Sequence, residues 1–247
     1  VATGVVQAFQ NCLRENGIDP KDVIFVAHST TQATNALIEG DVANVGVIGV
    51  GPKGVGGWIA KAQTNMKDIN LGSGRFIRLK NRFICDENLS DQLVTDTIKS
   101  LVGDGAQVIV ASESYGVDDM ENETGICKIA KDMGLEATAA SEITKLYGLT
   151  RRTRTAAINA SILPKMLNTA NSTEQSVKSA GVEVPLMIMR GDGGVMEISE
   201  MKKRPVLTML SGPAASVMGS LMYLRASNGV YFEVGGTTTN IGVIKDG

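Results

Sequence analysis

The sequence contains few of the residue types that usually reveal a function at once. Its 247 residues include one histidine, one tryptophan, three cysteines and only 4% aromatic residues. So few aromatic rings argue against a surface that stacks nucleic-acid bases. The net charge of −2 provides no broad basic surface for a phosphate backbone. We therefore expect no nucleic-acid partner.

The cysteines argue against a disulfide-rich or cysteine-ligated metal protein, and the hydrophobic runs argue against a membrane protein. Cys12, Cys85 and Cys127 are far apart and odd in number, so they form neither a metal motif nor a full set of disulfides. We expect reduced thiols in a cytoplasmic protein. No apolar run has the length of a membrane span and no signal peptide is visible, so we expect no membrane association.

What is present is an alternation of apolar runs and helical patterns. A length of 247 residues with 43% hydrophobic residues supports one large domain or two smaller ones. The alternation predicts an α/β fold with a largely parallel sheet and flanking helices. The predicted strands cover residues 23–27, 45–50, 107–111 and 136–140, and the predicted helices cover residues 5–13, 89–102 and 120–133.

The pattern changes after Tyr147 and Gly148. A long helical stretch over 151–170 contains Pro164, which should kink it. A second helix over 172–180, a strand over 186–189 and another apolar run over 205–210 are expected to follow. We therefore predict two domains, residues 1–146 and 147–247, each incomplete.

The last strands enclose an unusual turn. Two β-branched and aromatic runs flank Gly235, Gly236, Thr237, Thr238 and Thr239. Glycines allow a close backbone approach, and free N–H groups with hydroxyls suit a phosphate. This predicts a phosphate-binding loop. A plain hairpin turn is the alternative, although such a turn favours Asn-Gly or Asp-Gly.

Four polar turns follow apolar runs, at residues 28–35, 190–194, 211–216 and 235–240. In open α/β sheets, ligands bind beyond the carboxyl ends of the strands. The four turns together favour a shared nucleotide or anion cleft over four unrelated turns.

The residues nearest the first strand have alternative interpretations. His28 is either a general acid/base or a polar group at a strand end, and the second reading is slightly favoured. Thr30 and Thr31 either cap the next helix or contact an anion at its N-terminus. The amide of Asn35 either holds the turn together or faces the cleft.

The remaining candidates lie in the later turns. Asp192, Gly193 and Gly194 either approach a ligand or turn the chain. Ser211 and Gly212 begin a helix as a cap or as a phosphate contact. Glu233 is a carboxylate at the end of a buried strand, where it needs a partner. Mg²⁺, held mostly through waters, would be that partner in a nucleotide site.

Three segments resemble motifs of the hydantoinase A/5-oxoprolinase family. Residues 28–39 are similar to its His-Gly-Thr-Thr-x-x-Thr-Asn-Ala segment, and residues 205–214 to its Arg-Pro-x-x-Thr-x-x-Ser-Gly-Pro-Ala segment. Residues 232–241 resemble its Phe-Asp-Met-Gly-Gly-Thr-Ser-Thr-Asp-Val loop. The order and spacing agree over nearly the whole chain.

The resemblance implies an actin-like ATPase fold, with ribonuclease H-like domains around ATP and Mg²⁺. Family members use ATP to open cyclic amides such as hydantoins and 5-oxoproline, and relatives are subunits of ketone carboxylases. It implies phosphate contacts from the 235–239 loop, Ser211 and Gly212, with His28, Thr30, Thr31 and Asn35 coming from the opposite domain. Glu233, Asn240 and His28 are the candidate catalytic residues, and Glu233 is the candidate metal ligand. A hydantoinase B-like second subunit and an oligomer are also implied.

The chain departs from the family pattern in several places. The family's first phosphate loop would precede Val1, so we expect a fragment that lacks a complete ATP site. Glu233 and Asn240 stand where the family has Asp. Ala140, Ser141 and Glu142 replace a Ser-His-Glu run.

Three hypotheses follow from these motifs. The first is that the chain is part of an ATP-dependent cyclic-amide hydrolase. The second is a nucleotide-binding or assembly subunit without turnover, which Asn240 favours. The third is phosphotransfer to a small acid or sugar, which would give a phosphorylated product without ring opening.

Overall fold

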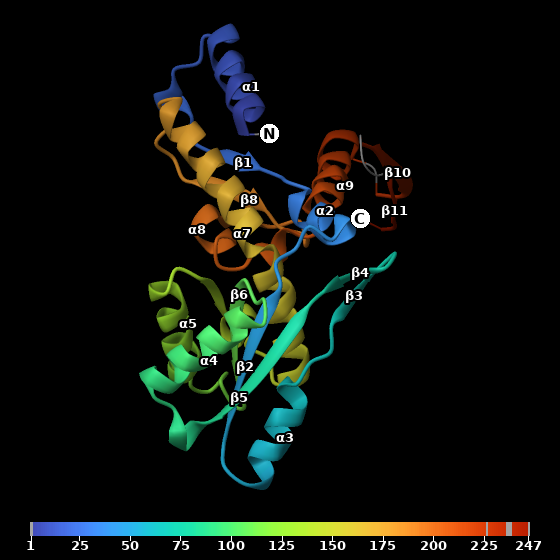
Figure 1. Ribbon diagram of the computed structural model, residues 1–247. Coiled ribbons are helices and arrows are strands. Elements are labelled where there is room, and N and C mark those ends of the chain that lie inside the picture. Colours follow the sequence, from blue (N-terminus) through green and yellow to red (C-terminus); the bar gives the residue numbers. More distant parts are fainter. Residues whose placement is uncertain (1, 226, 236–238, 247) are drawn as a thin grey trace. The chain divides into compact units, whose positions relative to one another are not determined.

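The structure is a computed structural model that describes residues 2–225, 227–235 and 239–246 (Figure 1). The chain forms two compact units. Unit 1 contains Val1–Asn35 and Met166–Gly247, and unit 2 contains Ala36–Lys165. The predicted domain boundary near residues 146 to 150 stays a prediction.

Unit 2 is built on a parallel four-stranded sheet. Its strand order is β5-β2-β6-β7, and every neighbouring pair runs parallel. Residues of β2 are buried along its whole length, as expected for a central strand covered on both faces. The strands are β2 (Val45–Gly51), β5 (Leu79–Cys85), β6 (Val108–Glu113) and β7 (Glu136–Ala139), and a separate hairpin contains β3 (Ile69–Gly72) and β4 (Arg75–Ile77).

Helices cover both faces of this sheet. One face packs on α4 (Asp91–Gly103) and α5 (Glu121–Asp132), whose buried Ile98 and Ile126 join Ile48 of β2 in one core. The other face meets α3 (Val55–Thr64) and the start of α7 (Leu149–Ser179). There Ser112 and Thr153 are hydrogen-bonded at 2.8 Å. The short α6 (Ala140–Ile143) follows β7. Unit 2 is therefore the three-layer α/β arrangement that the alternation of patterns predicted.

Unit 1 has a smaller mixed sheet of order β1-β8-β9. β1 pairs parallel to β8, and β8 pairs antiparallel to β9. Its strands are β1 (Val26–His28), β8 (Leu186–Met189) and β9 (Val195–Glu197), and a separate hairpin contains β10 (Gly229–Val234) and β11 (Thr239–Ile244). Its helices are α1 (Ala2–Glu15), α8 (Ile198–Met201) and α9 (Ser211–Leu224), while α2 (Gln32–Glu39) and α7 contribute residues to both units.

The predicted break between two helices near residue 171 is wrong. A single helix, α7, continues through Pro164 to Ser179. Its buried side chains recur at helical spacing on both sides of the expected break, at Met166, Ala170, Thr173 and Val177. Because this stripe is continuous, packing keeps the chain helical where the local sequence suggested a stop.

One predicted strand is shorter in the structure, and one apolar run forms no strand. Residues 23–27 form a strand only from Val26, and Ile24 is 90% exposed. No residue of β1 is fully buried and Ala27 is exposed, so this strand is not covered on both faces. The run 205–210 contains a 3₁₀ turn, Pro205–Thr208, because Pro205 lacks the N–H of a strand ladder and suits a first helical turn.

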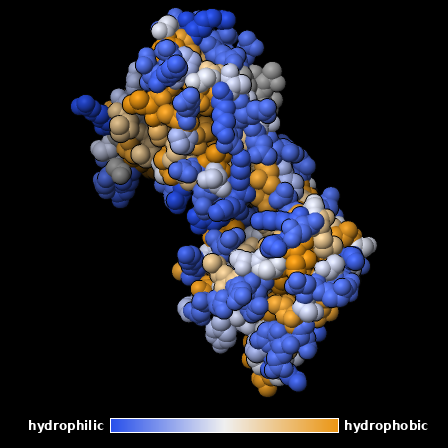
Figure 2. All heavy atoms as spheres, turned by 90° about the vertical axis from the view of Figure 1, so that its left-hand side faces the viewer, coloured by the Kyte–Doolittle hydropathy of each residue, from blue (hydrophilic) through white to orange (hydrophobic). Residues whose placement is uncertain are grey.

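The surface carries exposed hydrophobic residues in both units. Trp58 and Tyr223 are 72% and 91% exposed, and on the face shown in Figure 2 orange hydrophobic patches lie between hydrophilic ones. Within the described part of the chain, the helices are too short or too polar to cross a membrane.

Candidate functional site

Two of the predicted polar turns lie at one edge of the unit 1 sheet. β1 and β8 are parallel, and His28 at the end of β1 is opposite Ile188 near the end of β8. The turn after β1 and the Arg190–Gly194 turn after β8 therefore leave the sheet at the same edge, where α/β sheets bind ligands. This arrangement agrees with the grouping that the sequence suggested.

Ser211 joins the third turn to the first. Its side chain is fully buried, and its hydroxyl donates to the carbonyl oxygen of Thr30 at 2.9 Å. The hydroxyl of Ser29 donates to Ser211 Oγ at 3.3 Å. The N–H of Leu210 donates to Thr34 Oγ1 at 3.1 Å. Residues 28–35 and 211–212 thus lie in direct contact within one compact unit, and the beginnings of α2 and α9 are held together.

The first turn of α2 is capped by its own threonines. Thr30 Oγ1 accepts the N–H of Gln32 at 3.3 Å, and the carbonyl oxygen of Thr31 accepts the N–H of Asn35 at 2.9 Å. The amide of Asn35 donates to Thr31 Oγ1 at 3.4 Å. The capping interpretation of Thr30 and Thr31 and the turn-holding interpretation of Asn35 both match these contacts. A ligand contact by the exposed Thr31 stays a prediction.

Gly212 provides a close approach at the start of α9. A β-carbon added there would lie 3.0 Å from Thr31 Cγ2 and 3.8 Å from Glu233 Oε1. Gly212 therefore packs closely against Thr31 and lies near the carboxylate of Glu233. The fourteen-residue helix α9 begins here, so its positive dipole end lies beside these residues.

Glu233 and Asn240 lie near the loop end of the final hairpin. They are direct partners in the antiparallel register, and Asn240 Nδ2 donates to Glu233 Oε2 at 3.4 Å. Both residues are half-buried. The carboxylate thus has one neutral partner on its own sheet, and its other oxygen faces Gly212.

The loop between β10 and β11 is only partly described. The structure confirms the two flanking strands and describes Gly235 and Thr239 at the two ends of the loop. The prediction that Glu233 ends a buried strand is wrong, because no residue of β10 is buried and Val230, Phe232 and Val234 are exposed. Gly236, Thr237 and Thr238 lie outside the described residues. The phosphate-loop interpretation therefore stays a prediction.

The Arg190–Gly194 turn is explained locally. Asp192 accepts the N–H of Gly194 at 3.0 Å and forms an ion pair with Arg190. The backbone hydrogen bond from Gly194 and the neighbouring Arg190 hold the pKa of the Asp192 carboxyl below its usual value. Gly193 has a φ of +87°, which the turn requires. The chain-turning interpretation of Asp192, Gly193 and Gly194 accounts for these contacts, and a ligand role stays a prediction.

His28 lines a small cavity of about 90 Å³, which is formed by residues of β1, β8, α1 and α7. The cavity is otherwise formed mainly by apolar side chains, including Phe9, Val177 and Leu186. Burial lowers the pKa of the His28 imidazole, so the neutral form prevails near pH 7. A neutral imidazole can accept or donate one proton, but its acid/base role stays a prediction.

Two contacts of the site were not singled out from the sequence. Ser29 and Thr34 lie in the predicted turn and bond to the start of α9. The sequence feature that could have identified both residues is the high proportion of serine and threonine in that segment. Among the described residues, no group of three or more His, Cys, Asp or Glu side chains could hold a metal ion. Any cation here would therefore depend on Glu233 together with water or ligand oxygens.

The chain matches two family models and one curated relative. Residues 1–134 match the hydantoinase/oxoprolinase N-terminal region, and residues 152–247 match hydantoinase/oxoprolinase. An uncharacterized protein of Methanocaldococcus jannaschii is 27% identical over 143 residues, which are 56% of this chain and 21% of that protein.

Two solved structures share the fold. A nucleotide-free acetone carboxylase chain aligns with 99% of this chain at a TM-score of 0.74 and 17% identity. The ATP-dependent caprolactamase of Pseudomonas jessenii aligns with 96% at a TM-score of 0.66 and 18% identity. The chain spans 39% and 38% of those two chains.

These likenesses confirm the predicted fold class, an α/β fold of the actin-like ATPase type with mixed sheets and flanking helices. The motifs at residues 205–214 and 232–241 and residues 28–35 of the first motif lie in unit 1, and the first motif is hydrogen-bonded to the second. With both family regions matched in order along the sequence, the chain belongs to the hydantoinase/oxoprolinase family.

Proposed function

We propose that this chain is part of an ATP-dependent hydrolase that opens cyclic amides of the hydantoin or 5-oxoproline kind. The family membership and the ATP-dependent enzymes that share the fold support ATP use and amide chemistry. The acetone carboxylase and the caprolactamase are ATP-dependent enzymes, and we extend that property to this chain.

A single observation carries the proposal. Gly212, at the N-terminus of α9, lies close to Thr31 and to the carboxylate of Glu233, since a β-carbon added there would be 3.0 Å from Thr31 Cγ2 and 3.8 Å from Glu233 Oε1. A helix N-terminus favours a phosphate, whereas a carboxylate beside it favours a cation that accompanies the phosphate. The combination suits a magnesium nucleotide better than a free anion, which Glu233 would repel.

Each residue of this site would have a distinct role. Gly212 and the N–H groups that open α9 would hold phosphate oxygens, together with Thr31, Gly235 and Thr239. Ser211 positions α9 through its bond to Thr30. Glu233 would orient Mg²⁺ through water, and Asn240 would fix the carboxylate. ATP, when bound, supplies a phosphoryl group that makes the amide oxygen a leaving group.

The test is ATP·Mg²⁺ binding by calorimetry, together with phosphate release in the presence of hydantoin or 5-oxoproline. It should use the protein at the length in which it occurs in the cell. We expect Glu233→Gln to lower the rate roughly 10- to 100-fold, as for loss of a residue that orients a metal. Glu15→Gln, in an exposed position at the end of α1, is the matched control. Unchanged activity of Glu233→Gln would refute the assigned role.

A second candidate function is favoured by Asn240. An amide bonded to Glu233 provides no charge, so the chain would bind nucleotide or assemble a complex without turnover. Asn240→Asp distinguishes the two candidates. A rise in ATPase activity indicates an attenuated catalyst, and an unchanged zero rate with intact nucleotide binding indicates the non-catalytic subunit.

The partners follow the same proposal. The substrate would be a small cyclic amide, and a hydantoinase B-like second subunit would join this chain in a cytoplasmic oligomer. Co-purification from the native host at the endogenous level, followed by mass determination of the complex, tests this assembly.

A further inference from the structure

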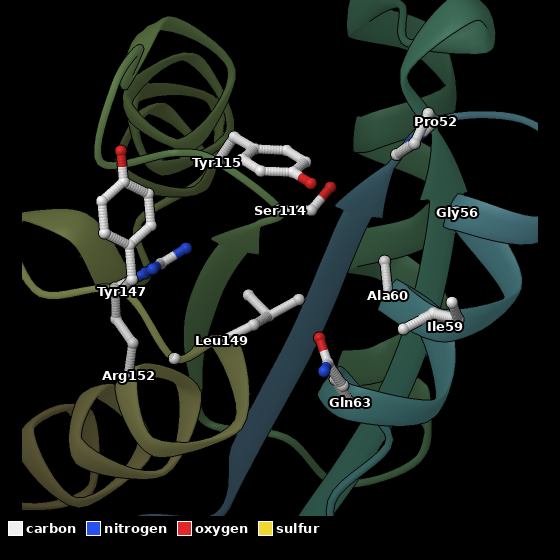
Figure 3. A pocket seen from close by; sticks show the side chains of 11 residues that line it. Pro52, Gly56, Ile59, Ala60, Gln63, Ser114, Tyr115, Tyr147, Leu149 and Arg152 are labelled. Atoms are coloured by element: carbon white, nitrogen blue, oxygen red, sulfur yellow. The ribbon is translucent and has the colours of Figure 1, made fainter.

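A second cavity, of about 350 Å³, lies in unit 2 (Figure 3). It opens at the carboxyl ends of β2 and β6, where Pro52 and Ser114 directly follow the two parallel strands. The location matches the usual ligand position of a parallel α/β sheet. The proposed nucleotide site lies in unit 1, so it does not account for this cavity.

Arg152 is the charged residue of the cavity. It lies in the first turn of α7 and is only 2% exposed. Its two terminal nitrogens donate to backbone carbonyls, Nη1 to that of Leu146 at 3.3 Å and Nη2 to that of Glu113. Its Nε is buried without a hydrogen-bond partner. Within the described part of the chain, no carboxylate comes within 4 Å to form an ion pair with it.

Ser114 supplies a second unsatisfied group. Its Oγ is also buried without a partner. It lies over the end of β2, because a β-carbon added at Gly51 would be 3.0 Å from it. A buried donor without a partner costs roughly 1–3 kcal/mol, so two in one cavity indicate a missing acceptor.

The other walls are apolar or aromatic. Figure 3 shows Pro52, Ile59 and Ala60 on one side of the cavity, and Tyr147 with Arg152 on the other. Tyr115 and Tyr147 are 71% and 68% exposed at the rim. Tyr115 has a φ of +64°, an uncommon conformation for a bulky residue and one often found at binding sites.

The nearby carboxylates are otherwise engaged. Glu123 accepts the N–H groups of Glu113 and Ser141 at 2.8 and 2.7 Å, and Glu113 accepts the amide of Asn122 at 2.8 Å. Burial raises the pKa of both carboxyls. Asp118 accepts the hydroxyl of Tyr147 at the rim. None of the three carboxylates lines the cavity.

We propose that this cavity binds a small organic carboxylate that has an apolar or planar body. The carboxylate would face Arg152 and Ser114, and the body would lie against Ile59, Ala60 and Leu149. Two unsatisfied groups suit the two oxygens of one carboxylate, whereas the apolar walls would leave a phosphate poorly solvated. The site is independent of the proposed ATP-dependent function.

The test uses benzoate as the probe, with benzamide as its uncharged isostere and inorganic phosphate as the anion without a body. Binding is measured by NMR shifts of the labelled full-length protein. We expect saturable benzoate binding with shifts confined to residues near the cavity, and at least tenfold weaker binding of benzamide and phosphate. Equal binding of benzoate and benzamide would refute a carboxylate site.

Two variants examine the residues. Arg152→Lys keeps the charge but removes Nε, and Ser114→Ala removes the hydroxyl, so each should weaken benzoate binding at least fivefold. Arg151→Lys, an exposed neighbour on the same helix, should leave the affinity unchanged. If Arg152→Lys unfolds the protein, the benzoate affinities of Ser114→Ala and of Ala60→Met, which fills the cavity, test the proposal instead. Both variants should bind benzoate more weakly. Unchanged affinity in both would overturn the proposal.

Discussion

Ser211 shows how a single hydroxyl can assemble a site. It is fully buried, at the point where α9 begins, and it bonds across 181 positions of sequence to the carbonyl oxygen of Thr30. A buried carbonyl that loses its donor costs free energy, because water does not replace the lost bond. The same residue therefore stabilises unit 1 and sets the position of the α9 N-terminus.

We expect Ser211→Ala to lower the free energy of unfolding by about 1–3 kcal/mol. Urea unfolding followed by circular dichroism measures this change. Ser220→Ala, which removes a hydroxyl bonded only within α9, should cost less. Equal losses of unfolding free energy in the two variants would show that the Ser211–Thr30 bond stabilises the protein no more than a bond within one helix.

His28 predicts a pH dependence of stability. Burial lowers the pKa of its imidazole below the usual 6.5, so the unfolded chain binds the proton more readily than the folded one. The stabilisation is therefore complete above pH 6.5 and is lost as the pH falls through the lower folded pKa. Since His28 is the single histidine, His28→Gln should flatten this part of the curve.

Urea midpoints between pH 5 and 8 provide the measurement for His28. The wild-type midpoint should fall more steeply below pH 6.5 than that of the variant. Parallel curves for the two proteins would mean that the imidazole ionises equally in the folded and unfolded states.

At the scale of elements, α7 is the main departure from the local sequence signals. It continues through Pro164, which removes one backbone N–H from the helix, and its buried stripe continues from Ile162 to Val177. Proline inside a helix is less favourable than alanine by up to about 3 kcal/mol. Tertiary packing therefore outweighs this local cost.

Pro164→Ala should raise the free energy of unfolding by about 1 kcal/mol or more, because it restores an intrahelical donor. The exposed Asn168→Ala in the same helix is the control, with an expected gain of a few tenths of a kcal/mol. Thermal unfolding of the two variants measures both changes. A loss of stability in Pro164→Ala would mean that the surrounding side chains have packed around a proline-specific bend.

At the scale of the whole molecule, the two units differ in how the chain builds them. Unit 2 is one continuous stretch, Ala36–Lys165, with its own parallel sheet and buried core. Unit 1 is assembled from two distant segments of the chain. Because a continuous segment with its own core has what a domain needs, unit 2 should fold independently.

Residues 36–165 expressed alone should therefore unfold cooperatively in urea and give a dispersed amide NMR spectrum. The matched fragment 1–134, cut at the end of the N-terminal family region, lacks the α7 packing onto β6 and should be less stable. A molten spectrum for 36–165 would show that unit 2 depends on unit 1.

Much of the fold could be predicted from the sequence, and less of the site. The runs at 45–50, 107–111 and 136–140 became neighbouring parallel strands, because their apolar composition requires burial on both faces. The apolar run at 205–210 was assigned no element, and the structure shows a 3₁₀ turn that begins at Pro205. The turns at 28–35 and 211–216 were identified, but the hydrogen bonds that join these segments span 176 to 182 positions and have no local signal.

The sequence by itself determined the α/β class, the family and the segments that carry the motifs, because periodicity and short motifs are local properties of the chain. Only the tertiary structure decided that Thr30 and Ser211 share a hydrogen bond and that Gly212 faces Glu233. It alone placed Arg152 and Ser114 in one cavity. These are contacts between distant segments, fixed by how strands pair and how helices pack on them.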